Sequence, residues 1–295
     1  MDTHTIHTIA THAHTAKGAD STRRHALAQR AKTGDLVRIA PGYYLDTEAI
    51  TTHPAPNVAV DLARLLAIQH RHPHLIASGP TAAWLRDLPL LREHPLHVTT
   101  TSDHHPRPVT LPEIQAGLLH VPAVTVRPHR PRGGRSPAMV RCGGEIISAT
   151  LEDTIIECAL TLKQEEAFVV ACAGLHELAR YRRFYRDDSR RREENNRSRL
   201  LRIISSIGPH TPGRTSARWV ITHADAGCES AGESRLLYLL VRGGLQGLET
   251  QYPVSAANKW YFIDIAVPEH RIGIEFDGRG KYGSDVDSVH RSIEA

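Results

Sequence analysis

Two strand-like runs near the C-terminus constrain the fold of this chain more than any other sequence feature. They cover residues 260–267 and 272–277, with a turn between them. If residues 269 and 270 form the tip of this turn, pairing extends outward from them and places Asp264 directly opposite Glu275. The two runs therefore predict an antiparallel hairpin in which two carboxylates face each other.

A third carboxylate shares this face, because Asp277 lies two residues beyond Glu275 and side chains alternate along a strand. Opposed like charges destabilise a hairpin unless a cation separates them. Mg²⁺ is the simplest such cation, and it serves phosphodiester cleavage. We therefore predict Asp264 and Glu275 as metal ligands. The alternative is a slipped register that leaves one acid at an exposed edge.

A helix precedes this hairpin and stops at Gly243-Gly244. Glu233 lies in its first turn, where it is a candidate for a further acidic ligand. The alternative is that an acid is simply favourable there, because the helix dipole places positive charge at the N-terminus.

A second compact pattern lies at residues 21–45. Ser21 or Thr22 is the predicted cap of a helix that Gly34 ends, and two short strand-like runs follow it around Pro41-Gly42. A helix followed by a short basic hairpin is typical of a winged helix-turn-helix, whose helix enters the DNA major groove. The alternative is a small scaffold with no role in DNA binding. The predicted DNA-binding residues are Arg23, Arg24, Arg30, Lys32 and Arg38.

Charge and composition fit an anionic partner without proving one. The 295 residues carry a net charge of +4, and the sequence pI is about 9.0. Residues 180–202 are rich in arginine, whose planar guanidinium suits phosphate. The alternative is a solvated helix with Arg/Glu pairs. With no Cys-x-x-Cys pair, no apolar run of bilayer length and no signal-peptide core, we expect a cytoplasmic protein that does not enter a membrane.

The middle of the chain predicts an α/β scaffold without paired catalytic groups. We expect helices from residue 57, after Ser78, after the cap Thr150, and over residues 165–181. Trp84 is interpreted as a core residue rather than as a stacking surface.

Three segments resemble the AbiEi-type antitoxin proteins of bacteria. They are residues 21–45, residues 76–90 (Ile-Ala-Ser-Gly-Pro-Thr-Ala-Ala-Trp-Leu-Arg-Asp-Leu-Pro-Leu) and residues 147–154. Two further segments, at residues 232–235 and 275–282, resemble a C-terminal domain often fused to these antitoxins. That domain is similar to very-short-patch-repair endonucleases of the PD-(D/E)XK nuclease superfamily.

This resemblance implies a DNA-binding regulator of a type IV toxin–antitoxin or abortive-infection system. Its partners are then double-stranded DNA and, functionally, a nucleotidyltransferase toxin. The implied nuclease positions are Glu233, Asp264 and Glu275, with Asp277 where the superfamily often has lysine and Lys281 supplying that charge instead. Only a short segment follows Gly278, so we expect a truncated and inactive nuclease-like site.

The expected fold class is α+β and multidomain, with a winged helix-turn-helix, an α/β middle domain and a partial restriction-endonuclease-like α/β domain. The expected parts are a flexible His/Thr-rich tail (1–20), a winged-helix DNA-binding unit (21–52), an AbiEi-like α/β domain (53–182), an Arg-rich linker or helix (183–224) and a nuclease-like fragment (225–295). Three functions remain open: a DNA-binding regulator, a Mg²⁺-dependent endonuclease, and an antitoxin that acts only by binding protein.

Overall fold

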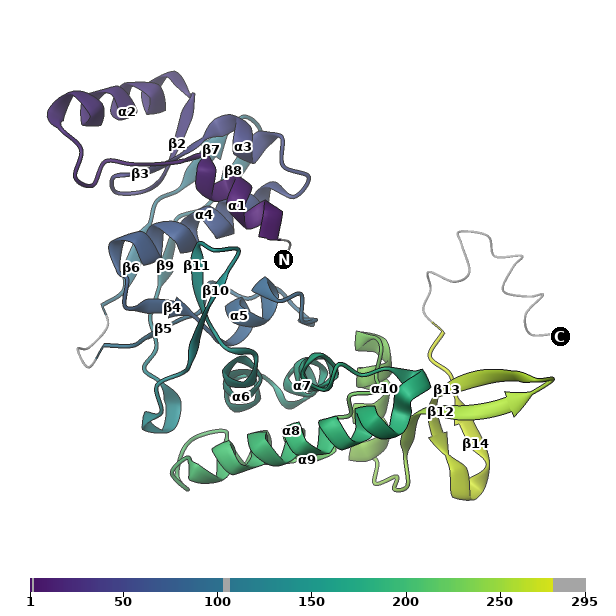
Figure 1. Ribbon diagram of the computed structural model, residues 1–295. Helices are drawn as coiled ribbons and strands as arrows, with labels where there is room; N and C mark the ends of the chain where they lie inside the picture. The colour runs from purple at the N-terminus through teal and green to yellow at the C-terminus, as the bar shows by residue number, and fades with distance from the viewer. Residues whose placement is uncertain (2, 103–106, 278–295) are drawn as a thin grey trace. The chain divides into compact units, whose positions relative to one another are not determined.

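A computed structural model describes residues 1, 3–102 and 107–277 of the chain. They form a mixed α+β fold, as the sequence predicts (Figure 1). The chain divides into two compact units. Unit 1 combines Met1–Leu162 with Ile203–Thr215, and unit 2 combines Lys163–Arg202 with the chain from Ser216 onward. The division therefore follows Leu162 rather than the expected boundary at residue 182.

Unit 1 begins with a small antiparallel sheet of order β1-β3-β2 and its helices. The elements are α1 (Thr3–Thr11), β1 (Ala13–Thr15), α2 (Ser21–Thr33), β2 (Leu36–Ala40), β3 (Tyr43–Asp46) and α3 (Thr47–Thr51). The expected flexible tail, residues 1–20, thus contains a helix and a strand. Ile6 and Ile9 lie three residues apart on one helix face, and their burial holds α1 in the core.

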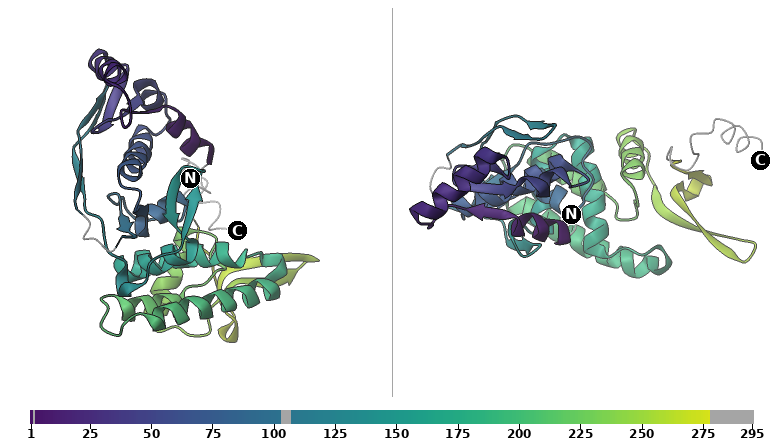
Figure 2. Two further views of the ribbon diagram at one scale, coloured as in Figure 1. Left: turned by 60° about the vertical axis from the view of Figure 1, so that its left-hand side comes forward. Right: turned by 90° about the horizontal axis from the view of Figure 1, so that it is seen from above.

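Helix α4 (Pro56–Arg71) forms the middle of unit 1 (Figure 2). From Ala59 to Gln69 every residue except Asp61 is buried, so the helix is enclosed on nearly all sides. Its buried polar residues have partners. The Gln69 side chain donates to the backbone oxygen of Ile147 (2.6 Å) and accepts from the Ile147 backbone nitrogen (2.9 Å). These two bonds fix α4 to a neighbouring strand.

The second part of unit 1 is a four-stranded sheet of order β10-β11-β4-β5, in which only the β11–β4 pair is parallel. Its elements are β4 (Leu75–Ala77), α5 (Gly79–Leu85), β5 (Val98–Thr100), η1 (Arg132–Gly134), β10 (Met139–Cys142), β11 (Ile146–Ala149) and α6 (Leu151–Thr161). Two antiparallel ribbons complete the unit: β6 (Val109–Leu111) with β9 (Val124–Val126), and β7 (Ile114–Ala116) with β8 (Leu119–Val121). The predicted cap Thr150 is confirmed, since its side chain accepts from the Asp153 backbone nitrogen.

Unit 2 combines helices with a three-stranded antiparallel sheet of order β12-β13-β14. Its elements are α7 (Gln164–Ala179), η2 (Arg183–Tyr185), α8 (Arg186–Ser206, whose last turn belongs to unit 1), α9 (Arg214–His223), α10 (Ala231–Arg242), β12 (Glu249–Ala256), β13 (Lys259–Val267), η3 (Pro268–His270) and β14 (Ile272–Ile274). Residues 183–224, expected as an Arg-rich linker or helix, are therefore mostly helical. Across the described residues of both units, no helix is apolar over enough length to cross a bilayer.

Candidate nucleic-acid interface and acidic cluster

Helix α2 begins and ends at residues with defined capping geometry. The Asp20 side chain accepts a hydrogen bond from the Arg23 backbone nitrogen (2.7 Å) and caps the N-terminus. The predicted caps, Ser21 and Thr22, are therefore wrong: Asp20 lies just before the first turn, where its carboxylate also meets the positive end of the helix dipole. Gly34 ends the helix as predicted, in the left-handed conformation with φ 87°.

Helix α2 has one anchored face and a large exposed one. Leu27 is its only buried residue, and Figure 1 shows the helix lying along the β2–β3 hairpin. All five predicted DNA-binding residues are exposed. We refer to Arg23, Arg24, Arg30, Lys32 and Arg38 as the basic surface.

Asp46, at the end of β3, binds Arg30 of the basic surface and so links α2 to the sheet. Its carboxylate accepts from Arg30 (3.1 Å), His14 (3.0 Å) and His12 (3.1 Å). Burial alone would raise the pKa of Asp46, but the hydrogen bonds from the two histidines and the charge of Arg30 hold it below its ordinary value. Sequence patterns do not reveal this cluster, because its members come from three separate segments of the chain that only the tertiary structure brings together.

The tip of the β2–β3 hairpin is packed against its surroundings. The Ala16 backbone nitrogen donates to the Gly42 oxygen (2.8 Å), and the Tyr43 ring lies 5.7 Å from the His70 ring between centroids. Burial raises the pKa of Tyr43 to about 12, with the charge of Glu145 adding to it. The hairpin therefore presents Arg38, the only exposed residue of β2, from a fixed backbone.

In unit 2 the predicted hairpin register is confirmed. Ile265 pairs with Ile274 and Val267 pairs with Ile272, around a turn at Pro268–Arg271. The paired strand β14 ends at Ile274, one residue before Glu275. The Asp264 carboxylate instead accepts a hydrogen bond from the Phe276 backbone nitrogen (2.9 Å). Asp264 thus holds the chain that continues β14.

Glu233 is buried at the start of α10 and forms a capping box. Its carboxylate accepts from the Glu229 backbone nitrogen (2.8 Å), while the Ser230 hydroxyl accepts from the Glu233 backbone nitrogen (3.1 Å). Burial raises the pKa of Glu233; the Glu229 and Ser230 hydrogen bonds oppose this, and the charge of Asp264 adds to it. The charge of Asp264 therefore acts on Glu233, and whether the two acids form one site stays a prediction.

Two other members of the predicted acidic site, Glu275 and Asp277, lie on the segment that follows β14. The ring of Phe276 lies directly against Gly232, so the segment after β14 passes the first turn of α10. Glu275 and Asp277 on this segment are exposed. Within the described ranges no three histidine, cysteine or acidic side chains are placed to hold one metal ion. Lys281 lies outside the described residues.

Several arginines of α8 bind acids or carbonyls inside the protein, and Arg190 has the most partners. Arg190 binds Glu193 (2.7 Å) and Asp225 (2.7 Å), and it also donates to the hydroxyl of Thr250 (2.7 Å). Burial alone would lower the pKa of Arg190, but these two carboxylates hold it above its ordinary value. The phosphate-binding interpretation of this segment receives no support from these contacts.

No protein-family model matches the chain, and no curated protein matches it.

Proposed function

We propose that the chain is a DNA-binding transcriptional regulator, the antitoxin of a type IV toxin–antitoxin or abortive-infection system. Its basic surface contacts a DNA duplex through α2 and the β2–β3 hairpin, arranged as a winged helix. The observation that carries this proposal is the exposure of every cationic side chain of α2 on a helix that buries only Leu27. Such a helix gains little from its own packing and is free to enter a groove.

The element order and the sheet order support a winged-helix arrangement, whereas the segment before α2 departs from it. The elements run α1-β1-α2-β2-β3, and the sheet order β1-β3-β2 leaves the hairpin β2–β3 beside the helix. Residues 16–20, between β1 and α2, form a turn rather than the additional helix common in such motifs. In this arrangement Arg23 and Arg24, in the first turn of α2, lie nearest the bases, and Arg38 contacts phosphate.

An electrophoretic shift assay on the DNA upstream of the gene tests this proposal. We expect the double change Arg23→Ala, Arg24→Ala to weaken binding at least ~10-fold and to lower the salt slope by about 1 for each phosphate that the variant no longer neutralises. Arg141→Ala is the matched control, because Arg141 is an exposed arginine of β10, remote from α2 in sequence and in Figure 1. Unchanged affinity in the double variant would remove α2 from the interface.

The antitoxin role has its own test. Co-expression with a nucleotidyltransferase encoded beside this gene should relieve the growth arrest caused by that enzyme. Relief that persists in the Arg23→Ala, Arg24→Ala variant would separate toxin neutralisation from DNA binding, and absence of relief would remove the antitoxin role.

A second candidate, a Mg²⁺-dependent endonuclease related to the very-short-patch-repair enzymes, is supported by Phe276, whose backbone nitrogen donates to Asp264 and whose ring lies against Gly232, the residue before Glu233. In this proposal Asp264 and Glu275 hold the ion, and Glu233, Asp277 and Lys281 complete the site.

Plasmid nicking in Mg²⁺, abolished by EDTA and by Asp264→Ala or Glu275→Ala, is the expected result. Glu269→Ala, which changes an exposed acid in the turn of the same hairpin, is the control. Nicking by the two site variants at the parental rate would exclude this site.

A further inference from the structure

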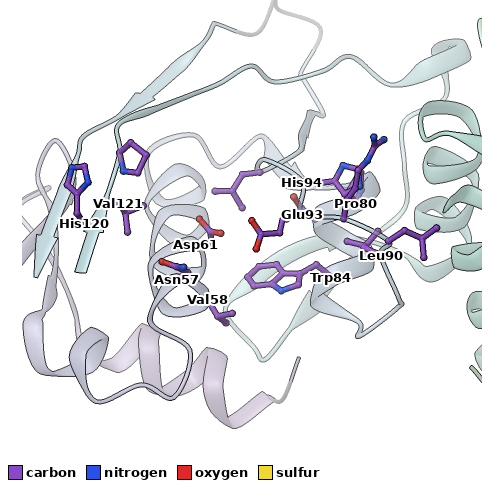
Figure 3. Close-up of a pocket in the computed structure, with 15 residues that line it drawn as sticks. Asn57, Val58, Asp61, Pro80, Trp84, Leu90, Glu93, His94, His120 and Val121 are labelled. Atoms are coloured by element: carbon purple, nitrogen blue, oxygen red, sulfur yellow. The ribbon is translucent and has the colours of Figure 1, made fainter. Parts of the chain in front are cut away.

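A cavity of about 680 Å³ lies in unit 1, between α4, α5 and the loop that follows α5 (Figure 3). Its volume falls within the range of roughly 300–1,000 Å³ that is usual for small-molecule sites. The cavity shares no residue with the basic surface or with the acidic cluster of unit 2. It is therefore a separate feature that the proposed function does not use.

Two carboxylates face each other in the middle of this cavity. Figure 3 shows Asp61, from α4, and Glu93, from the loop after α5, pointing toward one another beside the Trp84 ring. Glu93 is exposed and Asp61 is half-buried. Among the described residues, no hydrogen bond or ion pair holds either carboxylate. Two facing acids without such partners repel each other, and a cation between them would remove this repulsion.

The surroundings of Asp61 leave its charge incompletely balanced. Burial raises the pKa of Asp61; the charge of nearby Arg64 opposes this, and the charge of Glu93 raises it further. The Arg64 guanidinium donates its hydrogen bonds elsewhere, to the backbone oxygens of Pro112 (3.1 Å) and Pro122 (2.8 Å). A cation that enters the cavity would therefore meet an acid that Arg64 does not bind.

The wall of the cavity suits an organic body rather than a bare ion. The half-buried indole of Trp84 lies beside the two acids, and the apolar side chains of Val58, Leu90 and Val121 also line the space. An aromatic face attracts a cation placed over it and also packs against an alkyl chain.

The histidine and arginine side chains of the wall lie toward its ends. Figure 3 shows His94 and His120 at opposite ends of the cavity, away from the two acids, and His120 lies 3.2 Å from the Glu113 carboxylate. Arg92, which also lines the cavity, is exposed. The centre is thus formed by Asp61, Glu93 and Trp84.

We propose that this cavity binds a small organic cation of the alkylguanidine or alkylamine class. The cationic group lies between Asp61 and Glu93, and the alkyl body packs against Trp84. The proposal does not depend on DNA binding.

Isothermal titration calorimetry of the full chain with agmatine, which carries a guanidinium and an amine on a butyl chain, tests it. We expect binding that Asp61→Asn and Glu93→Gln each weaken about tenfold and that Trp84→Leu weakens several-fold. N-butylurea, a neutral analogue, should bind at least ~10-fold more weakly than agmatine. Glu48→Gln, which removes an exposed acid of α3 outside the cavity, should leave agmatine binding unchanged.

Because Glu93 is exposed, Glu93→Gln tests the site without risk to folding. Equal agmatine affinity in the parent and in the Asp61→Asn, Glu93→Gln double variant would overturn the proposal. Equal affinity of the parent for agmatine and N-butylurea, or no heat of binding up to roughly 10 mM agmatine, would overturn it as well.

Discussion

Helices α2 and α8 are both rich in arginine, yet the structure uses their guanidinium groups in opposite ways. In α2 only Arg30 has an acidic partner among the described residues, and Arg23 and Arg24 remain exposed. In α8, Arg190 and Arg197 both bind the buried Glu193, and Arg197 also donates to the Ala224 backbone oxygen (2.5 Å). Arginine content alone therefore does not identify a nucleic-acid surface. The acids and carbonyls that the fold brings near each guanidinium decide its role.

The largest effect that tests this comparison is expected at Arg190. Its replacement by alanine leaves the buried Glu193 and the partly buried Asp225 without their shared cation, which should lower the free energy of unfolding by about 3 kcal/mol. Urea denaturation measures this loss. Arg191→Ala is the control, because Arg191 is largely exposed and its ion pair with Asp188 lies on the surface, where such pairs contribute ~1 kcal/mol or less. Equal losses in both variants would mean that Arg190 is no more structural than its neighbour.

His97 is a buried histidine, and no acidic side chain of the described residues forms an ion pair with it. The His97 ring stacks on His129 with centroids 4.1 Å apart, and its Nδ1 lies 2.9 Å from the Ser78 hydroxyl. Burial lowers the pKa of His97 to about 3, and the positive charges of His129 and Arg132 add to this. The folded protein therefore keeps His97 neutral where the unfolded chain, with a pKa near 6.5, takes up a proton.

Keeping His97 neutral therefore makes the free energy of unfolding depend on pH. The contribution of His97 is fully present above pH 6.5 and is lost as the pH falls toward 3, at up to roughly 1.4 kcal/mol per pH unit. Denaturation curves between pH 6.5 and 5.5 should show this slope in the parent and a shallower one in His97→Gln. His25→Gln, at an exposed position of α2, should keep the parental slope. A parental slope in His97→Gln would show that other groups control the acid sensitivity.

The smallest expected effect on stability is that of the basic surface itself. Because Arg23 and Arg24 are exposed, their joint replacement by alanine should change the free energy of unfolding by no more than about 0.5 kcal/mol for each residue. Thermal denaturation of the same variant used for the DNA shift provides the measurement. A loss as large as that at Arg190 would show that these side chains, like those of α8, serve the fold.

Local signals in the sequence predicted several elements correctly. The Gly34 stop, the Thr150 cap and the pairing of β13 with β14 follow from conformational freedom, local hydrogen bonding and side-chain alternation. The N-terminal segment was predicted less well. Its many threonines and histidines concealed the two buried isoleucines of α1, since two apolar residues are too few to show a clear period.

The cavity beside α4 could not be found from sequence, because Asp61 and Glu93 are 32 residues apart and belong to no motif. Trp84, interpreted from sequence as a core residue, packs partly against the core and also lines this cavity.

The sequence by itself determined where the main helices and strands form, where Gly34 stops α2 and which residues of the C-terminal hairpin pair, because these depend on neighbours along the chain. Only the tertiary structure decided which arginines have acidic partners, which acids come close to each other and which histidine is kept neutral. Electrostatic energy depends on distance and burial, and both are set by residues that are remote in sequence.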